Sequence, residues 1–252
     1  MAEIFDEVTL NPDKDILLTL SETDSDEAIF LVHPVFGLAF PYLALSKRIP
    51  GKRLFGLNNP TFGQKQGRFI SIEQQTEHYV AAIRKVHPNG PYHLGGWSYG
   101  GVVAYEMAQQ LCAMGQEVET LVLIDSFFAS NRHWQQPDEV ALQNFMSKEG
   151  VDPESTFGKA FSVELQHNPE LLMNYQPRPY AGRVALIQAS QERELNNPLI
   201  FDNLVNHWEE LVEGEFNTYR INATHDDIFK ENNIGGNSKY PQSDICPTKC
   251  FA

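Results

Sequence analysis

One serine, Ser98, lies among four glycines in the stretch LGGWSYGG at residues 94–101. Its centre fits the pattern G-x-S-x-G, with an apolar run typical of a strand before it and a helical pattern after it. In such a turn the serine adopts a strained backbone, and glycine at positions 96 and 100 removes side chains that would collide. A phosphate-binding loop would need Lys and then Ser or Thr after the last glycine, where two valines stand. We therefore predict a nucleophilic serine at a strand end; a purely structural turn serine is the alternative.

A serine hydroxyl is a weak nucleophile until a base removes its proton, so Ser98 requires a histidine and an acid, in the order Ser, acid, His. The best candidate base is His225, because it follows the last predicted strand in INATHDDIF, at the edge where such sheets place their sites. Three other histidines follow the serine, but they fall in predicted helical segments: His133, His167 and His207. His33 precedes the serine, and we expect it to order an early loop.

The acid has two candidate positions, both at strand ends. Asp125 closes the apolar strand ETLVLID with no charged neighbour, which is an uneasy place for a carboxylate unless it accepts a hydrogen bond from an imidazole. Glu192 or Glu194 follows the next strand, where many α/β-hydrolases keep their acid, but both lie among polar residues that resemble a solvated loop. We favour Asp125.

Attack by a serine also requires donors for the negative oxygen that develops on the substrate. The backbone N–H of Tyr99, directly after the serine, is one expected donor. The second should come from the loop after an early strand, and HPVFG at residues 33–37 supplies the N–H of Val35.

The elements that must position these residues follow from the hydrophobic pattern. Buried strands are expected at 15–20, 28–34, 53–59, 92–97, 119–125, 182–189 and 216–223, because each is a short aliphatic or β-branched run bounded by turn residues. Helical patterns lie between several of them, for example at 71–87 and after Ser98. This alternation predicts an α/β fold with a mostly parallel sheet flanked by helices.

The alternation stops between Asp125 and residue 182, where an insertion at about 127–180 is too long for an ordinary connection and looks helical. We interpret it as a lid. Its large apolar side chains are expected mainly to bury the lid helices on each other, although some could line an acyl channel. They include Trp134, Phe145, Phe157, Phe161, Leu171, Leu172 and Tyr175.

Composition excludes several classes of partner. With 19 Lys and Arg against 33 Asp and Glu, the net charge is −14, and no basic stripe could follow a nucleic-acid backbone. No signal sequence and no long apolar run are visible, so we expect a cytoplasmic protein without a membrane segment. We predict one domain over residues 1–230 and a flexible tail over 231–252. The cysteines Cys246 and Cys250 lie in this tail, too few for a metal site.

Together, LVHPVFG, GGWSYGG, LVLID, the helical insertion and ATHDDIF resemble the type I thioesterase family, the off-loading domains of polyketide, fatty-acid and nonribosomal-peptide synthases. The resemblance spans about residues 28–230. In that family the acid follows the strand after the nucleophile helix, which again favours Asp125. The aromatic Trp97 before the serine is more similar to synthase-linked members than to free-standing editing members.

The resemblance implies an α/β-hydrolase fold, a Ser98–Asp125–His225 triad and an acyl-enzyme that forms from a thioester on the phosphopantetheine of an acyl or peptidyl carrier protein. No metal or organic cofactor is implied. Water, an internal nucleophile or an external one then gives hydrolysis, cyclisation or transfer. Because carrier proteins are commonly acidic and this chain is acidic too, docking would need tethering in a larger protein or a local basic patch, for which Lys47, Arg48, Lys52 and Arg53 are candidates. A carboxylesterase or lipase acting on oxoesters, and a binding module without catalysis, remain alternatives.

Overall fold

Seven strands form one sheet in the order β1-β3-β2-β4-β5-β6-β7, with β1 antiparallel to β3 and the other pairs parallel. The computed structural model of the chain describes residues 16–128, 137–191, 207–230, 233 and 250. The strands are β1 Leu17–Ser21, β2 Ala28–Val32, β3 Arg53–Leu57, β4 Tyr92–Trp97, β5 Val118–Ile124, β6 Val184–Ala189 and β7 Phe216–Ile221. Each predicted strand is present, with ends shifted by a few residues, so the predicted α/β sheet is confirmed.

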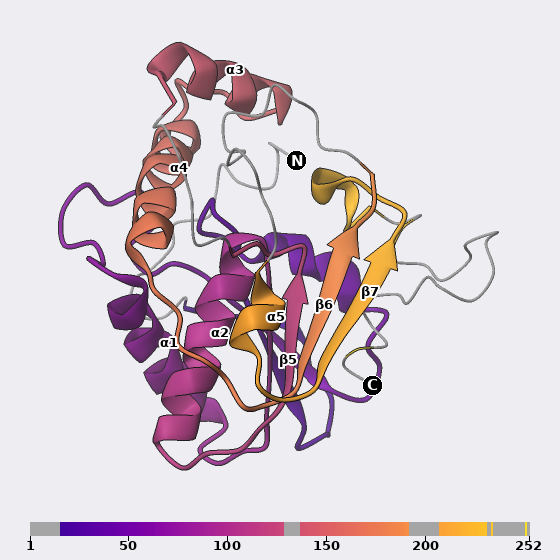
Figure 1. Cartoon of the computed structure of the whole chain (residues 1–252). Coiled ribbons are helices and arrows are strands. Elements are labelled where there is room, and N and C mark those ends of the chain that lie inside the picture. Colours follow the sequence, from indigo (N-terminus) through magenta and orange to yellow (C-terminus); the bar gives the residue numbers. More distant parts are fainter. Residues whose placement is uncertain (1–15, 129–136, 192–206, 231–232, 234–249, 251–252) are drawn as a thin grey trace.

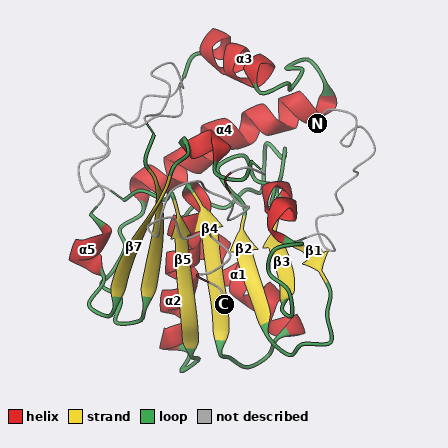
Figure 2. Ribbon diagram, turned by 90° about the vertical axis from the view of Figure 1, so that its right-hand side faces the viewer, coloured by secondary structure: helices red, strands yellow, loops and turns green. Residues whose placement is uncertain are grey.

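Two long helices cover one face of the sheet (Figure 2). They are α1 Ile72–Val86 and α2 Tyr99–Ala113, and α2 packs on β4 and β5. Helix α1 begins where the Ser71 hydroxyl accepts a hydrogen bond from the Gln74 amide, and its apolar residues fall on the buried side. The 3-10 helix η2, Phe40–Leu45, contributes Tyr42 and Leu45 to the core on the opposite face of the sheet.

Alternate residues of the central strands enter two separate apolar clusters, because neighbouring side chains of a strand point to opposite faces. In β2, Phe30 joins the cluster under α1 and α2, whereas Ile29 and Leu31 join the cluster that contains η2. All five residues of β2 are buried. The absence of polar alternation in the sequence therefore reflects a sheet that is covered on both faces.

The insertion between β5 and β6 contains α3 Glu139–Lys148 and α4 Thr156–Asn174. Both helices lie above the carboxyl ends of the parallel strands (Figures 1 and 2). Phe145, Phe157 and Phe161 pack with side chains of α3 and α4, as predicted.

The prediction for the other apolar residues of the insertion is wrong in part. Leu171, Leu172 and Tyr175 do not pack between insertion helices; they belong to the main core cluster with α1 and α2. The reason is that the second half of α4 descends onto α2, so its apolar face is covered by the body of the domain. Trp134 lies outside the described residues.

Two short elements complete the part of the chain that the structure describes. They are α5 Trp208–Leu211, within the longer helical pattern expected around His207, and the 3-10 helix η3 His225–Asp227 after β7. Most of the predicted tail, including Cys246, lies outside the described residues. Cys250, however, is half-buried against the cluster that contains η2, which differs from the free tail we expected.

Candidate active site

Ser98 stands at the turn between β4 and α2, with φ 57° and ψ −121°. Such a conformation is rare for a residue with a side chain and costs about 1–3 kcal/mol. The Ser98 N–H donates to the Ile124 carbonyl over 2.9 Å, so neighbouring β5 holds this turn in place. The serine is only half-buried, as a nucleophile must be.

The glycines around Ser98 are required by close backbone contacts. A Cβ on Gly96 would overlap the backbone of Gly100, and a Cβ on Gly100 would overlap the carbonyl oxygen of Val32 at the end of β2. Helix α2 can therefore begin against β2 and β4 only if both positions lack a side chain.

Asp125 directly follows β5, and only 2% of its surface is exposed. Its backbone also has a positive φ, 40°, and its N–H donates to the Ile187 carbonyl over 2.6 Å. The Ala189 N–H donates to Asp125 Oδ1 over 2.9 Å, and His225 Nδ1 lies 2.6 Å from Oδ2. Both carboxylate oxygens are thus satisfied, which is the condition for burying a charge.

His225 begins η3, four positions beyond the last residue of β7. Because a carboxylate accepts but does not donate, the bond to Asp125 requires the proton on Nδ1 and leaves Nε2 free of hydrogen in the neutral imidazole. The ring contacts two aromatic side chains, with centroid distances of 5.0 Å to Trp97 and 6.4 Å to Phe127. The predicted acid and base are therefore brought together at the sheet edge where β4 leads into Ser98.

The alternative acids and bases do not enter this arrangement where the structure describes them. His167 Nε2 contacts the Phe69 carbonyl at 2.8 Å, and His207 Nδ1 contacts Glu210 at 2.7 Å. Glu192, Glu194 and His133 lie outside the described residues.

The loop at residues 33–37 follows β2, and because its Val35 N–H is the predicted oxyanion donor we call it the oxyanion loop. His33 Nδ1 lies 2.7 Å from the Pro34 carbonyl, and the Gly37 N–H also donates to that carbonyl, over 3.0 Å. The Pro34 carbonyl and the Val35 N–H belong to the same planar peptide unit. Hydrogen bonds to the carbonyl therefore orient the N–H that we predicted as an oxyanion donor.

A buried chain of hydrogen bonds connects the residue after the serine to this loop. The Tyr99 hydroxyl donates to Gln75 Oε1 over 2.6 Å, and Gln75 Nε2 donates to the Tyr79 oxygen over 3.1 Å. The Tyr79 oxygen in turn lies 2.7 Å from His33 Nε2. The carbonyl of Pro34 accepts only, so His33 carries its proton on Nδ1 and receives the Tyr79 proton at Nε2.

Burial sets the protonation state of the side chains in this series of hydrogen bonds. It lowers the pKa of His33 to about 4 and raises the pKa of Tyr79 and Tyr99 well above the usual value. All four side chains are neutral near pH 7. Apart from His33, this series of hydrogen bonds could not be predicted from the sequence, because Gln75 and Tyr79 look like ordinary members of an amphipathic helix.

A second buried polar group connects α4 to the same loop. The Glu164 carboxylate is fully buried and accepts from both terminal nitrogens of Arg68 at 2.9 Å. Asn168, one turn further along α4, donates to the Val35 carbonyl over 2.6 Å. Sequence reasoning missed these residues, although two polar side chains four apart on the apolar face of a helix were a visible signal.

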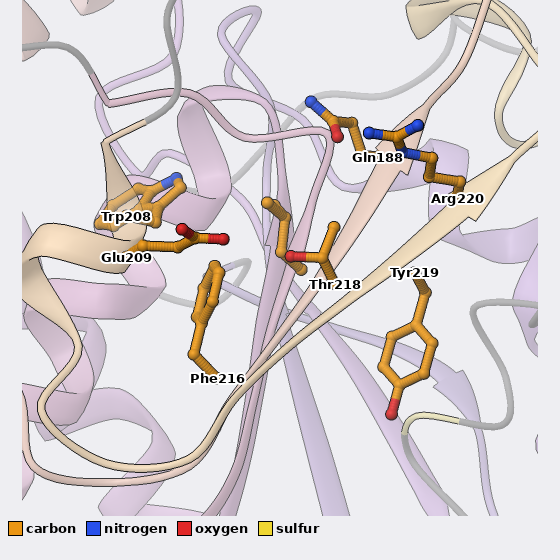
Figure 3. A pocket seen from close by; sticks show the side chains of 8 residues that line it. Gln188, Trp208, Glu209, Phe216, Thr218, Tyr219 and Arg220 are labelled. Atoms are coloured by element: carbon orange, nitrogen blue, oxygen red, sulfur yellow. The ribbon is translucent and has the colours of Figure 1, made fainter.

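A separate hollow of ≈ 610 Å³ lies on β6, β7 and α5 (Figure 3). Figure 3 shows Gln188 and Arg220 at one end of it and Trp208 at the other, while Tyr219 points away from the other labelled side chains. Its lining does not include Ser98, Asp125 or His225. Residues 192–206, which join β6 to α5, lie outside the described residues, so we assign this hollow no function.

The basic patch predicted as a carrier contact is not free for that role. Lys52 pairs with Glu27 at 2.9 Å, and Arg53 donates to the Asp26 carbonyl over 3.1 Å. Both lie at the amino end of β3, whereas Ser98 follows the carboxyl end of β4. A five-residue strand spans roughly 16 Å, so Lys52 and Arg53 lie at the opposite edge of the sheet from Ser98.

Among the described residues, no helix combines the length and the apolar character needed to cross a membrane.

Several known proteins are similar to this chain in sequence. The chain is 28% identical over 247 residues to a dimodular nonribosomal peptide synthase of Bacillus subtilis (strain 168), covering 85% of this chain and 10% of that protein. It is 38% identical over 110 residues to an N-(5-amino-5-carboxypentanoyl)-L-cysteinyl-D-valine synthase of Amycolatopsis lactamdurans. This match covers 43% of this chain and 3% of that protein. The chain thus spans a tenth or less of the length of these relatives.

Solved structures support the same relationship. The NocB thioesterase domain in covalent complex with a fluorophosphonate nocardicin G analogue is 35% identical, with a TM-score of 0.70, covering 86% of this chain and 93% of that one. The surfactin thioesterase domain SrfTE, at 21% identity and a TM-score of 0.66, shares the fold. The family described as Thioesterase domain matches residues 27–235. By its sequence and its fold, this chain belongs to the thioesterase domain family.

Proposed function

We propose that this protein is a serine thioesterase that releases an acyl, polyketide or peptidyl chain from the phosphopantetheine arm of a carrier protein, through an acyl-enzyme on Ser98. One observation carries the proposal. The buried Asp125–His225 hydrogen bond, 2.6 Å long, lies at the sheet edge where Ser98 occupies its strained turn. Family membership and the nonribosomal-peptide and polyketide synthases among the relatives support the substrate class.

In the proposed acylation, the Ser98 oxygen attacks the thioester carbonyl carbon while His225 Nε2 accepts the hydroxyl proton. Asp125 keeps the imidazole in the required tautomer and stabilises its positive charge. The backbone N–H groups of Tyr99 and Val35 donate to the oxygen that becomes negative. Collapse of this tetrahedral species breaks the carbon–sulfur bond, and the imidazolium returns its proton to the departing thiolate.

Deacylation repeats these steps with a second nucleophile. His225 removes a proton from water, from an internal hydroxyl or amine, or from an external acceptor, and Ser98 leaves as the alcohol. The product is then a free acid, a ring or a transferred ester or amide. The chemistry uses only these side chains and amides, so we expect no metal or organic cofactor.

The insertion at residues 127–180 is proposed to act as the lid that shapes the acyl site, because α3 and α4 lie above the edge that carries Ser98 (Figure 2). Phe161 of α4 stacks on Phe36 of the oxyanion loop, with ring centroids 5.4 Å apart. The ring centroids of Phe36 and Trp97 are 6.2 Å apart. This aromatic contact supports an apolar acyl group at the site. Carrier-bound substrates and the sparse cysteines agree with the cytoplasmic location that we expect.

Intact-mass spectrometry tests the proposal. The native chain is mixed with an acyl-pantetheine thioester or an acylated carrier protein, alongside the variants Ser98→Ala and Asp125→Asn. We expect a covalent acyl mass on the native chain that is absent from Ser98→Ala, together with loss of the thioester. Cleavage of matched oxoesters with thioesters left intact would instead indicate a carboxylesterase, and absence of fluorophosphonate labelling at Ser98 would indicate a binding module.

A further inference from the structure

Helix α4 carries two fully buried polar residues, Glu164 and Asn168, on the side that faces the oxyanion loop. Asn168 Nδ2 donates both to the Val35 carbonyl over 2.6 Å and to Glu164 Oε2 over 3.1 Å. A side-chain amide has two N–H hydrogens, so both contacts can be made at once. The insertion therefore contacts the backbone of the loop that is proposed to hold the oxyanion.

The Asn168 contact completes the fixation of Val35. The peptide unit before Val35 is held by His33 through the Pro34 carbonyl, and the unit after it is held by Asn168 through the Val35 carbonyl. With both flanking units fixed, the direction of the Val35 N–H is determined from two sides. Loss of the Asn168 bond would free the second unit and leave a half-buried carbonyl without this donor.

Glu164 extends this control to the end of the loop. Its carboxylate accepts from Asn59 Nδ2 over 2.8 Å, and the Asn59 N–H donates to the Gly37 carbonyl over 2.8 Å. Gly37, with φ +86°, also passes so close to Glu164 that an added Cβ would lie 3.0 Å from Cγ of Glu164. The loop is thus held at Val35 and at Gly37 by groups that share one carboxylate.

The ion pair between Arg68 and Glu164 adds little to the stability of the fold, because burying its two charges costs free energy. Arg68 is 8% exposed and Glu164 is not exposed at all, so both charges are desolvated. Buried pairs of this kind stabilise a fold no better than apolar residues of similar size, although breaking one of them is harmful. A role in fixing geometry accounts for such a pair better than a contribution to folding.

We propose that Asn168 is a positioning residue of the reaction: from the insertion, and oriented by Glu164, it sets the direction of the Val35 N–H towards the substrate oxygen. The inference rests on the proposed function, since it assumes that Val35 donates to an oxyanion. It makes the insertion part of the catalytic geometry as well as a wall of the acyl site. A displacement of about 1 Å at such a donor can cost roughly a hundredfold in rate.

The variant Asn168→Leu keeps the side-chain shape and removes the donor. A matched control is Tyr175→Phe, which removes a different buried contact of the same segment, the 2.8 Å bond from Tyr175 Oη to Glu106. For both variants and the native chain, kcat and KM are measured on an acyl-pantetheine thioester. The affinity of the matching acyl trifluoromethyl ketone, which binds serine as a tetrahedral oxyanion, and the thermal midpoint are measured in parallel.

We expect Asn168→Leu to lower kcat about 10- to 100-fold with KM changed less than threefold, and to weaken trifluoromethyl ketone binding by a similar factor. Tyr175→Phe should lower the thermal midpoint but change kcat less than threefold. An unchanged kcat in folded Asn168→Leu, or an equal loss in Tyr175→Phe, overturns the positioning role alone. If the native chain neither cleaves thioesters nor reacts at Ser98 with a fluorophosphonate, the proposed function fails and the positioning role with it. Should Asn168→Leu not fold, Asn168→Ala is subjected to the same measurements and the same criteria.

Discussion

His225 Nδ1 and Asp125 Oδ2 lie 2.6 Å apart, although one hundred positions separate the two residues in the chain. The contact exists because β5 and β7 end at the same edge of a parallel sheet, on either side of β6. The first prediction concerns this hydrogen bond. An amide in place of the Asp125 carboxylate can neither stabilise the imidazolium of His225 nor reliably select its Nδ1–H tautomer.

Asp125→Asn should therefore lower kcat for thioester cleavage by roughly 10³- to 10⁴-fold, the loss found when this acid is replaced in other serine hydrolases. Steady-state kinetics and a thermal melt measure the effect. Asp227→Asn, in the same 3-10 helix as His225 but paired with Lys230, is the control and should change kcat less than twofold. Equal losses in the two variants would argue against Asp125 as the acid of the triad.

The second prediction concerns the turn that presents Ser98. Gly100→Ala places a Cβ against the carbonyl oxygen of Val32, which belongs to a central strand and cannot move away. We expect the free energy of unfolding to fall by about 3 kcal/mol or more. Gly115→Ala, also glycine but with open space and φ +73°, should cost only about 1 kcal/mol. Urea unfolding of both variants compares them, and similar losses would mean that the close contact is relieved elsewhere.

The third prediction follows from the buried imidazole of His33. Its pKa is lowered to about 4 in the folded chain, against a usual value of 6.5, because burial disfavours the charged form. Between these values the unfolded chain binds a proton that the folded chain does not, so stability is lost as the pH falls from 6.5 towards 4. The total is about 3 kcal/mol. His33→Asn has no titrating ring and can still donate to Pro34.

The measurement is the free energy of unfolding of the native chain and of His33→Asn at several pH values between 7 and 4. Carboxylates contribute equally to both curves, so the difference isolates His33. The native curve should decline more steeply. Parallel curves would show that folding leaves the pKa of His33 unshifted.

The fourth prediction replaces an expectation drawn from charge alone. Because Lys52 is paired with Glu27 at the amino edge of the sheet, Lys52→Glu should change KM for an acylated carrier protein and for a small thioester by the same small factor, under twofold. The two KM values are compared in one buffer at low salt, where surface electrostatics are strongest. A selective rise for the carrier substrate would restore the amino edge as a docking surface.

The sequence was sufficient to predict the sheet and the contact between Asp125 and His225. Ser98, Asp125 and His225 each follow a strand with a strong apolar pattern, and the parallel topology brings strand ends to one edge. Of these, Asp125 and His225 meet in a hydrogen bond, and the role of Ser98 beside them stays a prediction. The role of Val35 as an oxyanion donor was inferred from its place after an early strand in the same way, and it stays a prediction.

What could not be predicted depends on contacts between side chains of distant segments. Nothing local indicates that Glu164 of α4 meets Arg68, or that Gln75 of α1 connects Tyr99 to Tyr79, because each partner fits its own helix or loop. The descent of α4 onto α2 likewise depends on packing in three dimensions. The pairing of Lys52 with Glu27 could not be predicted for the same reason.

The contacts between α4 and the rest of the domain limit which segments can be exchanged between thioesterase domains. Engineers who wish to change the product released would graft the insertion of another thioesterase onto this sheet. A graft that replaces the residues at positions 164, 168 and 175 would break three buried connections, to the loop at 59–68, to Val35 and to α2, and would impair the recipient whatever acyl group it fits. Segments that stop short of α4, such as α3 and the turn after it, are the places where sequence can be recombined while the catalytic apparatus keeps its shape.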